Sequence, residues 1–596
     1  MGQSKKPLRL GIVMAGAVSA GAYQGGVIDY FLQIMDAWEK AKLANDPNVP
    51  THDVRLDIIS GASAGGMTSG MIVAALQQKH APVTTDKRGD EAYKKTNVLY
   101  NAWVNLMADE MLPLLLSTDD IKREGKVISA LNADFIKQIA DREINPQKCT
   151  ESKLPSYVNP NMEVLLTLTN LAGFQYRLFF TGADTSYHAM SQHKDFASFR
   201  LGKTYTGNGR IPLDINAGIG DAELRQAAPA TGAFPVGLAY RQIQRKKKYI
   251  FENEDLLFAK KASGSPDARD IAANAINYQL VGYSDDPNYN PEEVMTTFHV
   301  DGGLINNQPF DLSMKIMNRM GATTEAITET DFDSTILMID PFPAVESVFH
   351  DGKLVPDAAT PVENMTGDFP FSLMAEIGKV FGSMRGQLLF KGQDIVDAFN
   401  DENFSRFLIS PSGDKLGNTY EGSKAIACGC MDGFGGFIDK SFREHDFYLG
   451  RANAQNFFRW HFVVKLGDDM KPINPIFTDN YPAAAVTRFK FQYEKDKKTM
   501  GANAPWYVPM IPDLFYDGTD KTEEKAPEFP KYDMSTFDKY RGDVLNRMDA
   551  IASNMLSGWI KRFYKIYFFL CKKSLYEKLR GVIEGALQEW KLVPRK

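Results

Sequence analysis

The sequence predicts an α/β protein: a three-layer α/β/α sandwich around a mostly parallel sheet, followed by a largely helical C-terminal lobe. Three observations support this fold class. A buried strand, a glycine-rich turn and an apolar helix follow one another from Val54 to Gln78. Strand-like and helix-like segments then alternate, which is typical of a parallel sheet covered on both faces. From about Phe342 the chain becomes rich in Pro and Asp, so we expect one domain over residues 1–345 and another over residues 346–596.

The first two strand-and-helix units lie close to the N-terminus. An apolar run, Leu8–Met14, predicts the first strand, which is followed by a flexible loop, Ala15–Gly21, and a helix, Ala22–Lys42. Apolar, β-branched residues predict the second strand, Val54–Ser60, and an apolar run predicts the helix Met67–Gln78. A helix after each strand is the pattern that builds a parallel sheet.

Further elements follow from the same patterns. Residues 79–160 look largely helical, and we interpret them as an insertion over one edge of the sheet. The later strands are expected at Glu163–Thr169, Phe174–Phe180, Thr297–Val300 and Thr335–Asp340. The later helices are expected at Asp221–Ala228 and Gln308–Met320, with a further core-facing helix carrying Phe371, Met374, Ile377, Phe381, Met384 and Leu388.

The composition is that of a folded protein of 596 residues, 44% of them hydrophobic and 24% charged. The formal charge of −6 argues against a protein that coats nucleic acid, so no nucleic-acid partner is expected. Four cysteines are too few for a disulfide framework, which favours a reducing, cytoplasmic location with Cys428 and Cys430 as buried thiols. The uncharged stretch Leu10–Ile28 could suggest a signal peptide or a membrane span, but its five glycines favour a catalytic loop.

The turn Gly61-Ala62-Ser63-Ala64-Gly65 places a serine between a strand and a helix. In this setting Gly-x-Ser-x-Gly holds its serine in a strained turn, with the hydroxyl exposed at the carboxyl end of the strand. The N-terminus of the next helix offers unpaired N–H groups where an oxyanion would form. Ser63 is therefore a candidate nucleophile. The alternative is a glycine-rich turn whose serine only caps the helix.

Asp301 follows the strand Thr297–Val300 and precedes two glycines. In a mostly parallel sheet, Ser63 and Asp301 would both project from the carboxyl ends of strands, where ligands of such sheets bind. A carboxylate at that place can take the serine proton directly, without a histidine between them. The alternative is an aspartate that only shapes a turn.

Three stretches gain meaning when they are read together: Met14–Val27, Gly61–Gly65, and Val300–Pro309 with its pattern Asp-Gly-Gly-x-x-x-Asn-x-Pro. In this order and at these separations, the chain resembles the patatin-like phospholipases over about residues 8–342. The resemblance implies a three-layer α/β/α fold and a Ser–Asp dyad that hydrolyses acyl esters of lipids. Carried over by position, Ser63 is the nucleophile and Asp301 the base.

The resemblance also implies an oxyanion hole made by the amides of the first loop, around Gly16, Ala17 and Val18. The family's loop usually has three consecutive glycines and then a basic residue, and this chain departs from that pattern. Alanine and valine amides can still donate hydrogen bonds, but a valine at positive φ would be strained. Ala64, next to the serine, and Phe234, in a stretch that loosely resembles the family's substrate-side loop, are the expected substrate contacts.

These features predict a lipid acyl hydrolase of phospholipase A or lipase type that works through an acyl-enzyme and requires no metal or cofactor. One alternative is a Ser-His-Asp hydrolase whose base is His299, His350, His445 or His461. Another is a catalytically inactive membrane scaffold, which the altered glycine loop would favour. We interpret His445 and Asp446 as a structural polar pair.

The second domain carries Gly433–Phe437, Phe442–Phe447 and Leu449–Arg451, which resemble a C-terminal lobe of larger bacterial members of the family. Near its end, residues 555–580 combine a basic flank with apolar residues that share one helical face: Trp559, Ile560, Phe563, Ile566, Tyr567 and Leu570. A basic amphipathic helix of this kind can lie in an anionic lipid interface, so we expect peripheral contact with the inner face of a membrane. The alternative is a helix packed on its own lobe.

A second basic run, Arg241 and Arg245–Lys248, is interpreted as a solvated face. The expected partner of the protein is a phospholipid or another acyl lipid, and its oligomeric state is left open.

Overall fold

The fold is taken from a computed structural model. The described residues are 6–149, 153–179, 187–257, 278–283, 286–322, 328–343, 347–350, 353–356, 406–415, 417–515 and 522–594, with only the backbone described for 347–350 and 353–356. The helix expected around Phe371–Leu388 and the side chain of His350 lie outside this description.

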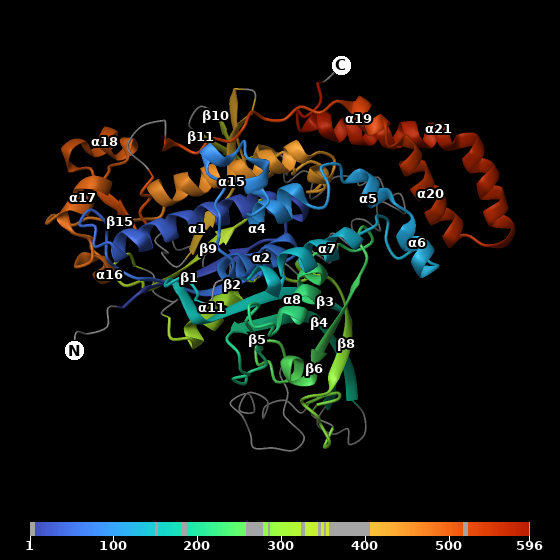
Figure 1. Cartoon of the computed structure of the whole chain (residues 1–596), viewed down its shortest axis with the longest axis horizontal. Helices are drawn as coiled ribbons and strands as arrows, with labels where there is room; N and C mark the ends of the chain where they lie inside the picture. Colours follow the sequence, from blue (N-terminus) through green and yellow to red (C-terminus); the bar gives the residue numbers. More distant parts are fainter. Residues whose placement is uncertain are drawn as a thin grey trace.

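A sheet of ten strands among the described residues forms the centre of the molecule (Figure 1). Neighbouring strands run parallel in the order β12 (Arg406–Ile409), β9 (Ser334–Ile339), β1 (Leu8–Met14), β2 (Val54–Gly61) and β3 (Val158–Phe179). The strand β8 (Val294–Asp301) pairs antiparallel with β3. The central sheet is thus mostly parallel, as predicted, and because β12 joins its edge, it continues past residue 345.

β3 is longer than the sequence predicted. The two strands expected at Glu163–Thr169 and Phe174–Phe180 are one strand with an irregularity between Thr169 and Phe174, paired antiparallel along its length with β4 (Tyr187–Leu201). The remaining strands of the sheet are β5 (Ile211–Leu213), β6 (Arg241–Lys246) and β7 (Tyr278–Leu280).

Helices cover both faces of the parallel part. α1 (Gly21–Leu43) and α2 (Ala64–Gln77) lie on one face, and α11 (Phe310–Arg319) lies on the other (Figure 1). The side chains of β1 alternate between the two faces: Ile12 packs in the core under α1 and α2, and Val13 packs in the smaller core under α11. This alternation gives the three-layer sandwich that the sequence predicted.

α1 is buried on almost all sides, because α15 (Lys440–Trp460) lies along it as well. A buried ion pair between Asp29 of α1 and Arg451 of α15 joins the two helices. The Arg451 guanidinium also donates to Gln33 at 2.6 Å and to Glu524 at 2.8 Å. The C-terminal part of the chain therefore packs directly onto the first helix of the sandwich.

Residues 79–160 are largely helical up to β3, as predicted. They form α3 (Glu91–Lys94), α4 (Val98–Tyr100), a π-helical turn (Asn101–Asn105), α5 (Leu112–Leu116), α6 (Asp119–Glu124) and α7 (Asp134–Glu143). Farther along, α8 (Asp221–Thr231) and α9 (Lys247–Phe251) flank β6.

The C-terminal part contains short strands and several helices. The strands outside the main sheet are β10 (Ser347–His350), β11 (Lys353–Pro356), β13 (Ser412–Lys415), β14 (Asn418–Glu421), β15 (Val463–Lys465) and β16 (Tyr507–Pro509). The helices besides α15 are α16 (Pro475–Thr478), α17 (Ala483–Phe489), α18 (Glu494–Met500), α19 (Met534–Asp538), α20 (Arg541–Met555) and α21 (Gly558–Glu589). α20 and α21 form a hairpin that projects from one end of the molecule (Figure 1).

The interpretation of the second basic run as a solvated face was wrong. Arg245 is fully buried and pairs with Asp195 at 2.6 Å, because its side chain leaves β6 on the same buried face as Ile243. Arg241 is half-buried and donates to the carbonyl of Ala133. Lys246 and Lys248 both pair with Glu292. The run is a set of ion pairs and not a free basic surface.

Cys428 and Cys430 are buried free thiols, as predicted, and burial raises the pKa of Cys430 to about 12. Within the described ranges, no helix is both long enough and apolar enough to cross a membrane. In the same residues, no cluster of three His, Cys, Asp or Glu side chains suited to a metal ion was found.

Candidate active site

Ser63 lies in the sharp turn between β2 and α2. Its backbone has φ 52° and ψ −124°, a conformation that few residues other than glycine adopt. Gly65 lets α2 pass close to β1, since a Cβ at this position would collide with the carbonyl oxygen of Met14. The Ser63 amide donates to Thr231 Oγ1 at 2.9 Å. α2 begins at Ala64, so the turn is tighter than the sequence predicted.

The Ser63 hydroxyl donates to Asp301 Oδ2 at 2.5 Å. The second carboxylate oxygen, Oδ1, accepts from the amide of Gly303 at 2.7 Å, which fixes the carboxylate plane. The backbone of Asp301 is held as well, because its carbonyl accepts from Thr169 Oγ1 at 2.8 Å. Ser63 and Asp301 are each only 5% exposed. A hydroxyl and a carboxylate thus meet in a site largely shielded from water.

The two residues meet although their strands run in opposite directions. Gly61, at the end of β2, pairs with Leu166 of β3 in parallel register. Asp301, at the end of β8, pairs antiparallel with Leu168, two residues farther along β3. Both residues therefore lie at the carboxyl ends of their strands, as expected, although β8 runs antiparallel to its neighbour β3. The long strand β3 extends past β2, and β8 runs back along this extension toward the serine.

The first loop, Ala15–Gly21, reaches the same site from the end of β1. The Gly16 amide donates to Asn307 Oδ1 at 3.2 Å. A Cβ at Gly16 would lie 3.0 Å from the Cβ of Ser63 and would collide with Asn307 Oδ1, so only glycine fits at this position. Asn307 is the asparagine of the Asp-Gly-Gly-x-x-x-Asn-x-Pro pattern, and it ties the first loop to the turn that carries Asp301.

Val18 has φ 48°, and a valine at such a positive φ is strained, as the altered loop sequence predicted. It begins a short 3₁₀ helix, Val18–Ala20, as Ala64 begins α2. The first amides of a helix have no partner inside the helix. Within the described residues, the amides of Ala17, Val18 and Ala64 form no hydrogen bond. These three donors, and not Gly16, remain available near Ser63.

The first loop is held in place by a distant segment, Cys430–Phe437, which we call the clamp loop. The Ser19 amide donates to the carbonyl of Gly433 at 3.0 Å, and the Ser19 hydroxyl donates to the same carbonyl. The Ser19 hydroxyl in turn accepts from the amide of Gly436 at 2.9 Å. These bonds connect residues more than 400 positions apart in the chain. The clamp loop is therefore part of the site.

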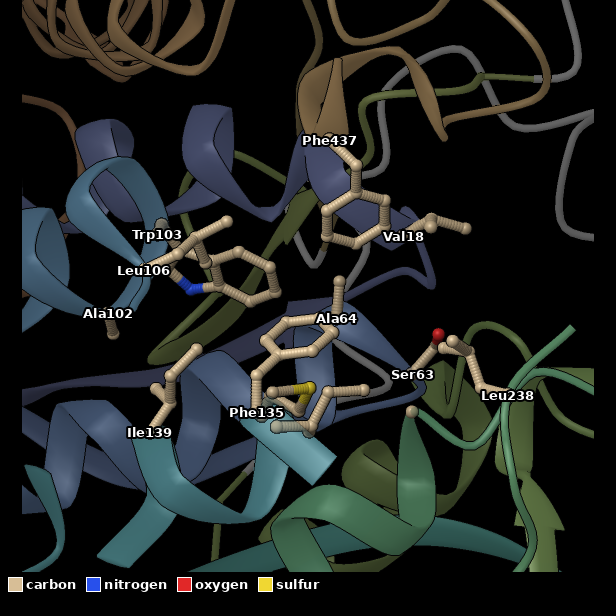
Figure 2. Close-up of a pocket in the computed structure, with 13 residues that line it drawn as sticks. Val18, Ser63, Ala64, Ala102, Trp103, Leu106, Phe135, Ile139, Leu238 and Phe437 are labelled. Carbon is tan, nitrogen blue, oxygen red and sulfur yellow. The ribbon is translucent and has the colours of Figure 1, made fainter. Parts of the chain in front are cut away.

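An apolar pocket opens beside the serine (Figure 2). Figure 2 shows Ser63 facing a hollow between Trp103, Phe135 and Phe437. The lining residues are Val18, Ser63, Ala64, Met67, Ala102, Trp103, Leu106, Phe135, Ile136, Ile139, Gly232, Leu238 and Phe437. Apart from the serine hydroxyl and the indole N–H, these side chains are hydrocarbon or thioether, so the pocket suits a hydrocarbon chain.

Most residues that line this pocket were not predicted from the sequence as part of the site. Trp103 and Leu106 come from the π-helical turn and the residue that follows it, and Phe135 comes from α7, both inside the helical insertion. π-helical turns are rare and often lie at functional sites, but they leave no clear pattern in a sequence. Phe437 belongs to the clamp loop, and only the Gly-Phe-Gly-Gly-Phe stretch hinted at a role for it.

The two expected substrate contacts differ in position. Ala64 lines the pocket directly beside Ser63. Phe234 is 37% exposed, and its ring packs edge-on against Phe434 of the clamp loop with 5.5 Å between centroids. From the same loop, Gly232 and Leu238 line the pocket. Phe234 therefore lies at the side of the site.

The three candidate histidines of a Ser-His-Asp triad whose side chains the structure describes have other partners. His299 contacts Asp195 Oδ2 at 2.8 Å, and burial lowers the pKa of its imidazole. His445 contacts Asp446 at 2.8 Å, and that carboxylate also accepts from the amides of Ala427 and Cys428. The ring of His461 lies 3.5 Å from the side-chain amide of Asn456. The polar pair of His445 and Asp446 thus shapes the backbone before the clamp loop, as predicted.

Comparison with known proteins identifies relatives. Residues 12–314 match the family model described as patatin-like phospholipase. An uncharacterized protein of Sinorhizobium fredii (strain NBRC 101917 / NGR234), y4iI, is 28% identical over 586 residues, which cover 93% of this chain and 77% of the relative. The crystal structure of VipD from Legionella pneumophila is 14% identical and covers 68% of this chain and 62% of that chain, less than two thirds of its length. Its TM-score of 0.18 is too low to support a structural argument.

Proposed function

Since the chain belongs to the patatin-like phospholipase family, whose members act on lipid esters, we propose that it hydrolyses carboxylic esters of acyl lipids through a dyad of Ser63 and Asp301. The observation that carries this proposal is the 2.5 Å hydrogen bond between Ser63 Oγ and Asp301 Oδ2 in a shielded site. A serine hydroxyl is a poor nucleophile until a base accepts its proton, and this carboxylate is in position to do so.

The first half-reaction forms an acyl-enzyme. Asp301 Oδ2 takes the proton as Ser63 Oγ bonds to the carbonyl carbon of the ester, whose C=O electron pair moves onto oxygen. When this pair returns, the bond from the carbon to the alcohol oxygen breaks. The leaving oxygen takes the proton from Asp301, and a lyso-lipid or alcohol departs. The bond from Gly303 to Oδ1 keeps Oδ2 directed at the serine during both proton transfers.

Three backbone amides suit the oxyanion of the tetrahedral intermediate. We assign this role to the amides of Ala17, Val18 and Ala64, since the Gly16 amide is already bonded to Asn307. The combination of the amide after the nucleophile with amides from another loop is typical of serine hydrolases with this turn. Each such donor is worth on the order of 3 kcal/mol to the transition state. Gly16 then contributes to the oxyanion hole because it lets the first loop lie close to Ser63, and not by donating a hydrogen bond to the oxyanion.

The second half-reaction releases a fatty acid. Water gives a proton to Asp301 and attacks the acyl carbon, and Ser63 leaves as its oxygen regains that proton. This chemistry requires no metal and no cofactor. The apolar pocket would hold the acyl chain, with Ala64 next to the reacting carbon and Phe234 at the side. We therefore assign the chemistry to residues 1–345 and assign to residues 346–596 the clamp loop that completes the site.

The substrate class suggests where the protein works. An ester in a bilayer is reached from the membrane surface, so the proposal includes peripheral contact of residues 555–580 with a membrane. The four free cysteines favour a reducing compartment, which for a membrane contact corresponds to the cytoplasmic, inner face.

Mass spectrometry of phospholipids incubated with wild type, Ser63→Ala and Asp301→Ala tests this function. We expect free fatty acid from the wild type and from neither of these two variants. Ser60→Ala, which should release fatty acid as the wild type does, is a matched control, because Ser60 is a buried serine of β2, just before the turn, and its hydroxyl contacts Ser313 at 2.7 Å. Fatty acid release by Ser63→Ala would refute the dyad. Failure of a fluorophosphonate probe to label Ser63 in the wild type would instead favour an inactive membrane scaffold.

Alanine at each candidate histidine separates the dyad from a triad. Replacing His299, His350, His445 or His461 in a dyad enzyme leaves the chemical step intact, whereas loss of the base of a triad lowers kcat by about 10⁴-fold or more. Thermal unfolding of each variant distinguishes a loss of fold from a loss of chemistry.

A further inference from the structure

The long C-terminal helix α21 has two unlike halves. Its second half is anchored: Tyr576 is buried, stacks on Phe537 and donates to Asp538 at 2.8 Å, and Arg580 pairs with the same carboxylate at 2.7 Å. Its first half, Gly558–Lys573, projects with α20 from one end of the molecule (Figure 1). The first half therefore has a fixed base and a free face.

The free face is apolar and aromatic. At 100° per residue, six side chains fall within an arc of about 120° on one side of the helix. Each is between 47% and 72% exposed: Trp559, Ile560, Phe563, Ile566, Tyr567 and Leu570. We call this set the aromatic face. A contiguous row of this kind on a water-exposed helix indicates an interaction site.

The side of α21 that packs on α20 is a different one. Tyr564, Phe568 and Leu575 are half-buried and fall on the far side from the aromatic face. Lys565 pairs with Asp549 of α20 at 2.5 Å, which fixes the rotation of the helix. The aromatic face thus belongs to a helix whose other side packs on α20. Its rotation about the axis is set by the hairpin.

Positive charge lies along one border of the aromatic face and on the opposite side of the helix. Arg562 and Lys573 border the aromatic face, Lys561, Lys565 and Lys572 lie on the opposite side, and all five are exposed. No acidic residue occurs between Gly558 and Tyr576. The chain from Met555 onward has a net charge of +7, whereas residues 1–554 have −13. A strongly basic segment of an acidic protein therefore contains this exposed apolar row.

We propose that the aromatic face docks on an anionic phospholipid surface, with α21 lying in the plane of the interface. This inference rests on the proposed function, which requires access to lipid, and it identifies the part of the chain that provides the access. Apolar and aromatic side chains would enter the boundary between headgroups and acyl chains, while Arg562 and Lys573 at the border of the face contact lipid phosphates. A second copy of the chain fits less well, because two such faces would bring their bordering cations together.

The hairpin is also connected to the pocket. Arg547 of α20 is buried, pairs with Asp120 of α6 and donates to the carbonyls of Ser117 and Ser129. The next residues of this insertion, Ala130 and Leu131, donate their amides to the carbonyls of Val236 and Gly237 at 2.8 and 3.0 Å.

Leu238 follows directly and lines the pocket, and Val236 is 82% exposed beside it. Two hydrogen-bonded segments therefore lie between the hairpin of α20 and α21 and the pocket. One is the part of the insertion that contains Ser129 to Leu131, and the other is the loop that contains Val236 to Leu238. A lipid surface bound by α21 would therefore be connected through these bonds to the wall of the pocket.

Co-sedimentation with lipid vesicles tests the docking surface. The full chain is mixed with phosphatidylcholine vesicles that contain or lack phosphatidylglycerol. We expect binding to the anionic vesicles, with about tenfold or greater weakening in the double variant F563S/L570S and in high salt. Val582→Ser is the matched control, because Val582 is 71% exposed on the same helix but lies outside the aromatic face.

Two readouts distinguish failure of this inference from failure of the proposed function. Ser63→Ala should bind vesicles as the wild type does, and F563S/L570S should hydrolyse a water-soluble short-chain ester at the wild-type rate. Equal binding by F563S/L570S and wild type, or equal binding to neutral and anionic vesicles, would overturn the docking surface. So would a wild-type dimer in light scattering that F563S/L570S converts to a monomer, since a second copy would then cover the face.

Discussion

Two loops leave the carboxyl ends of the adjacent strands β1 and β2, and each contains a non-glycine residue at positive φ. In the serine turn this residue is Ser63, with φ 52°, and in the first loop it is Val18, with φ 48°. Such conformations persist only where the surroundings hold them. The two loops are held in different ways.

The serine turn is held by its own strand-turn-helix unit, by the neighbouring β1, where Gly65 packs against Met14, and by one bond from the Ser63 amide to Thr231 of α8, 168 residues away. The first loop is held from still farther away, by Asn307 and by the clamp loop, which lie 291 and more than 400 residues away. The proposed nucleophile therefore depends mostly on the first 231 residues, whereas the groups that suit the oxyanion depend on much more of the chain being folded.

The largest effect is expected in the serine turn itself. Ser63→Ala and Asp301→Asn should each lower kcat by about 10⁴-fold or more, because they remove the nucleophile or the base. Asparagine keeps an oxygen for the Gly303 amide, so the turn should remain folded. The rate on a water-soluble ester measures the loss, and thermal unfolding within a few degrees of wild type shows that the fold is intact. A mild loss in Asp301→Asn would mean that another group takes the proton.

The next effect concerns the packing of the serine turn. Gly65→Ala should lower the free energy of unfolding by about 3 kcal/mol, because the new Cβ would collide with the carbonyl oxygen of Met14 and force α2 away from β1. Urea denaturation measures the change. Gly89→Ala is the control, since a Cβ at Gly89 meets no atom within 4 Å. Equal stability of the two variants would show that the turn is less tightly packed than its geometry indicates.

A smaller effect is expected from release of the first loop. Ser19→Ala removes the hydroxyl that joins Gly433 to Gly436 and should lower kcat about tenfold with little change in KM, because the oxyanion donors lose part of their positioning. Steady-state kinetics on a soluble ester measures both constants. Ser69→Ala is the counterpart in α2, behind the serine turn, where the lost hydroxyl donates to the carbonyl of Gly65, and its kcat should stay within about twofold of wild type. A larger loss of kcat in Ser69→Ala than in Ser19→Ala would contradict this contrast between the two loops.

The smallest effect is expected at Val18. Val18→Gly removes the strain of a β-branched residue at positive φ but also removes a pocket side chain, so the free energy of unfolding should change by less than about 1 kcal/mol. Urea denaturation and the rate on a soluble ester check the expectation. A loss of several kcal/mol would mean that the Val18 side chain, and not the clamp loop, holds the first loop in place.

The sequence was most informative where structure depends on neighbouring residues. The strand Leu8–Met14 has the predicted bounds, and the turn around Ser63 has the strained backbone that Gly-x-Ser-x-Gly predicts. The strain at Val18 could also be expected from the sequence, because Val18 stands where the family's loop usually has a glycine.

The sequence was least informative about contacts between distant segments. The antiparallel direction of β8 depends on how far β3 extends, which its apolar pattern does not fix. The bond from Gly16 to Asn307 and the bonds from Ser19 to the clamp loop join residues that no local pattern relates. Trp103 and Phe135 resemble ordinary core residues until the fold brings them beside the serine.

The distance between Ser19 and the clamp loop has a consequence for biosynthesis. A ribosome makes the chain from its N-terminus, so Ser63 and the first loop emerge long before Gly433, which lies 414 residues after Ser19. At 5–20 residues per second this interval is roughly 20 to 80 s. A nascent chain would therefore carry the strained turn around Ser63, but its first loop would lack the bonds to the clamp loop until Gly433 and Gly436 have been made. Chains that end before Gly433 should therefore have a first loop that is not held in place.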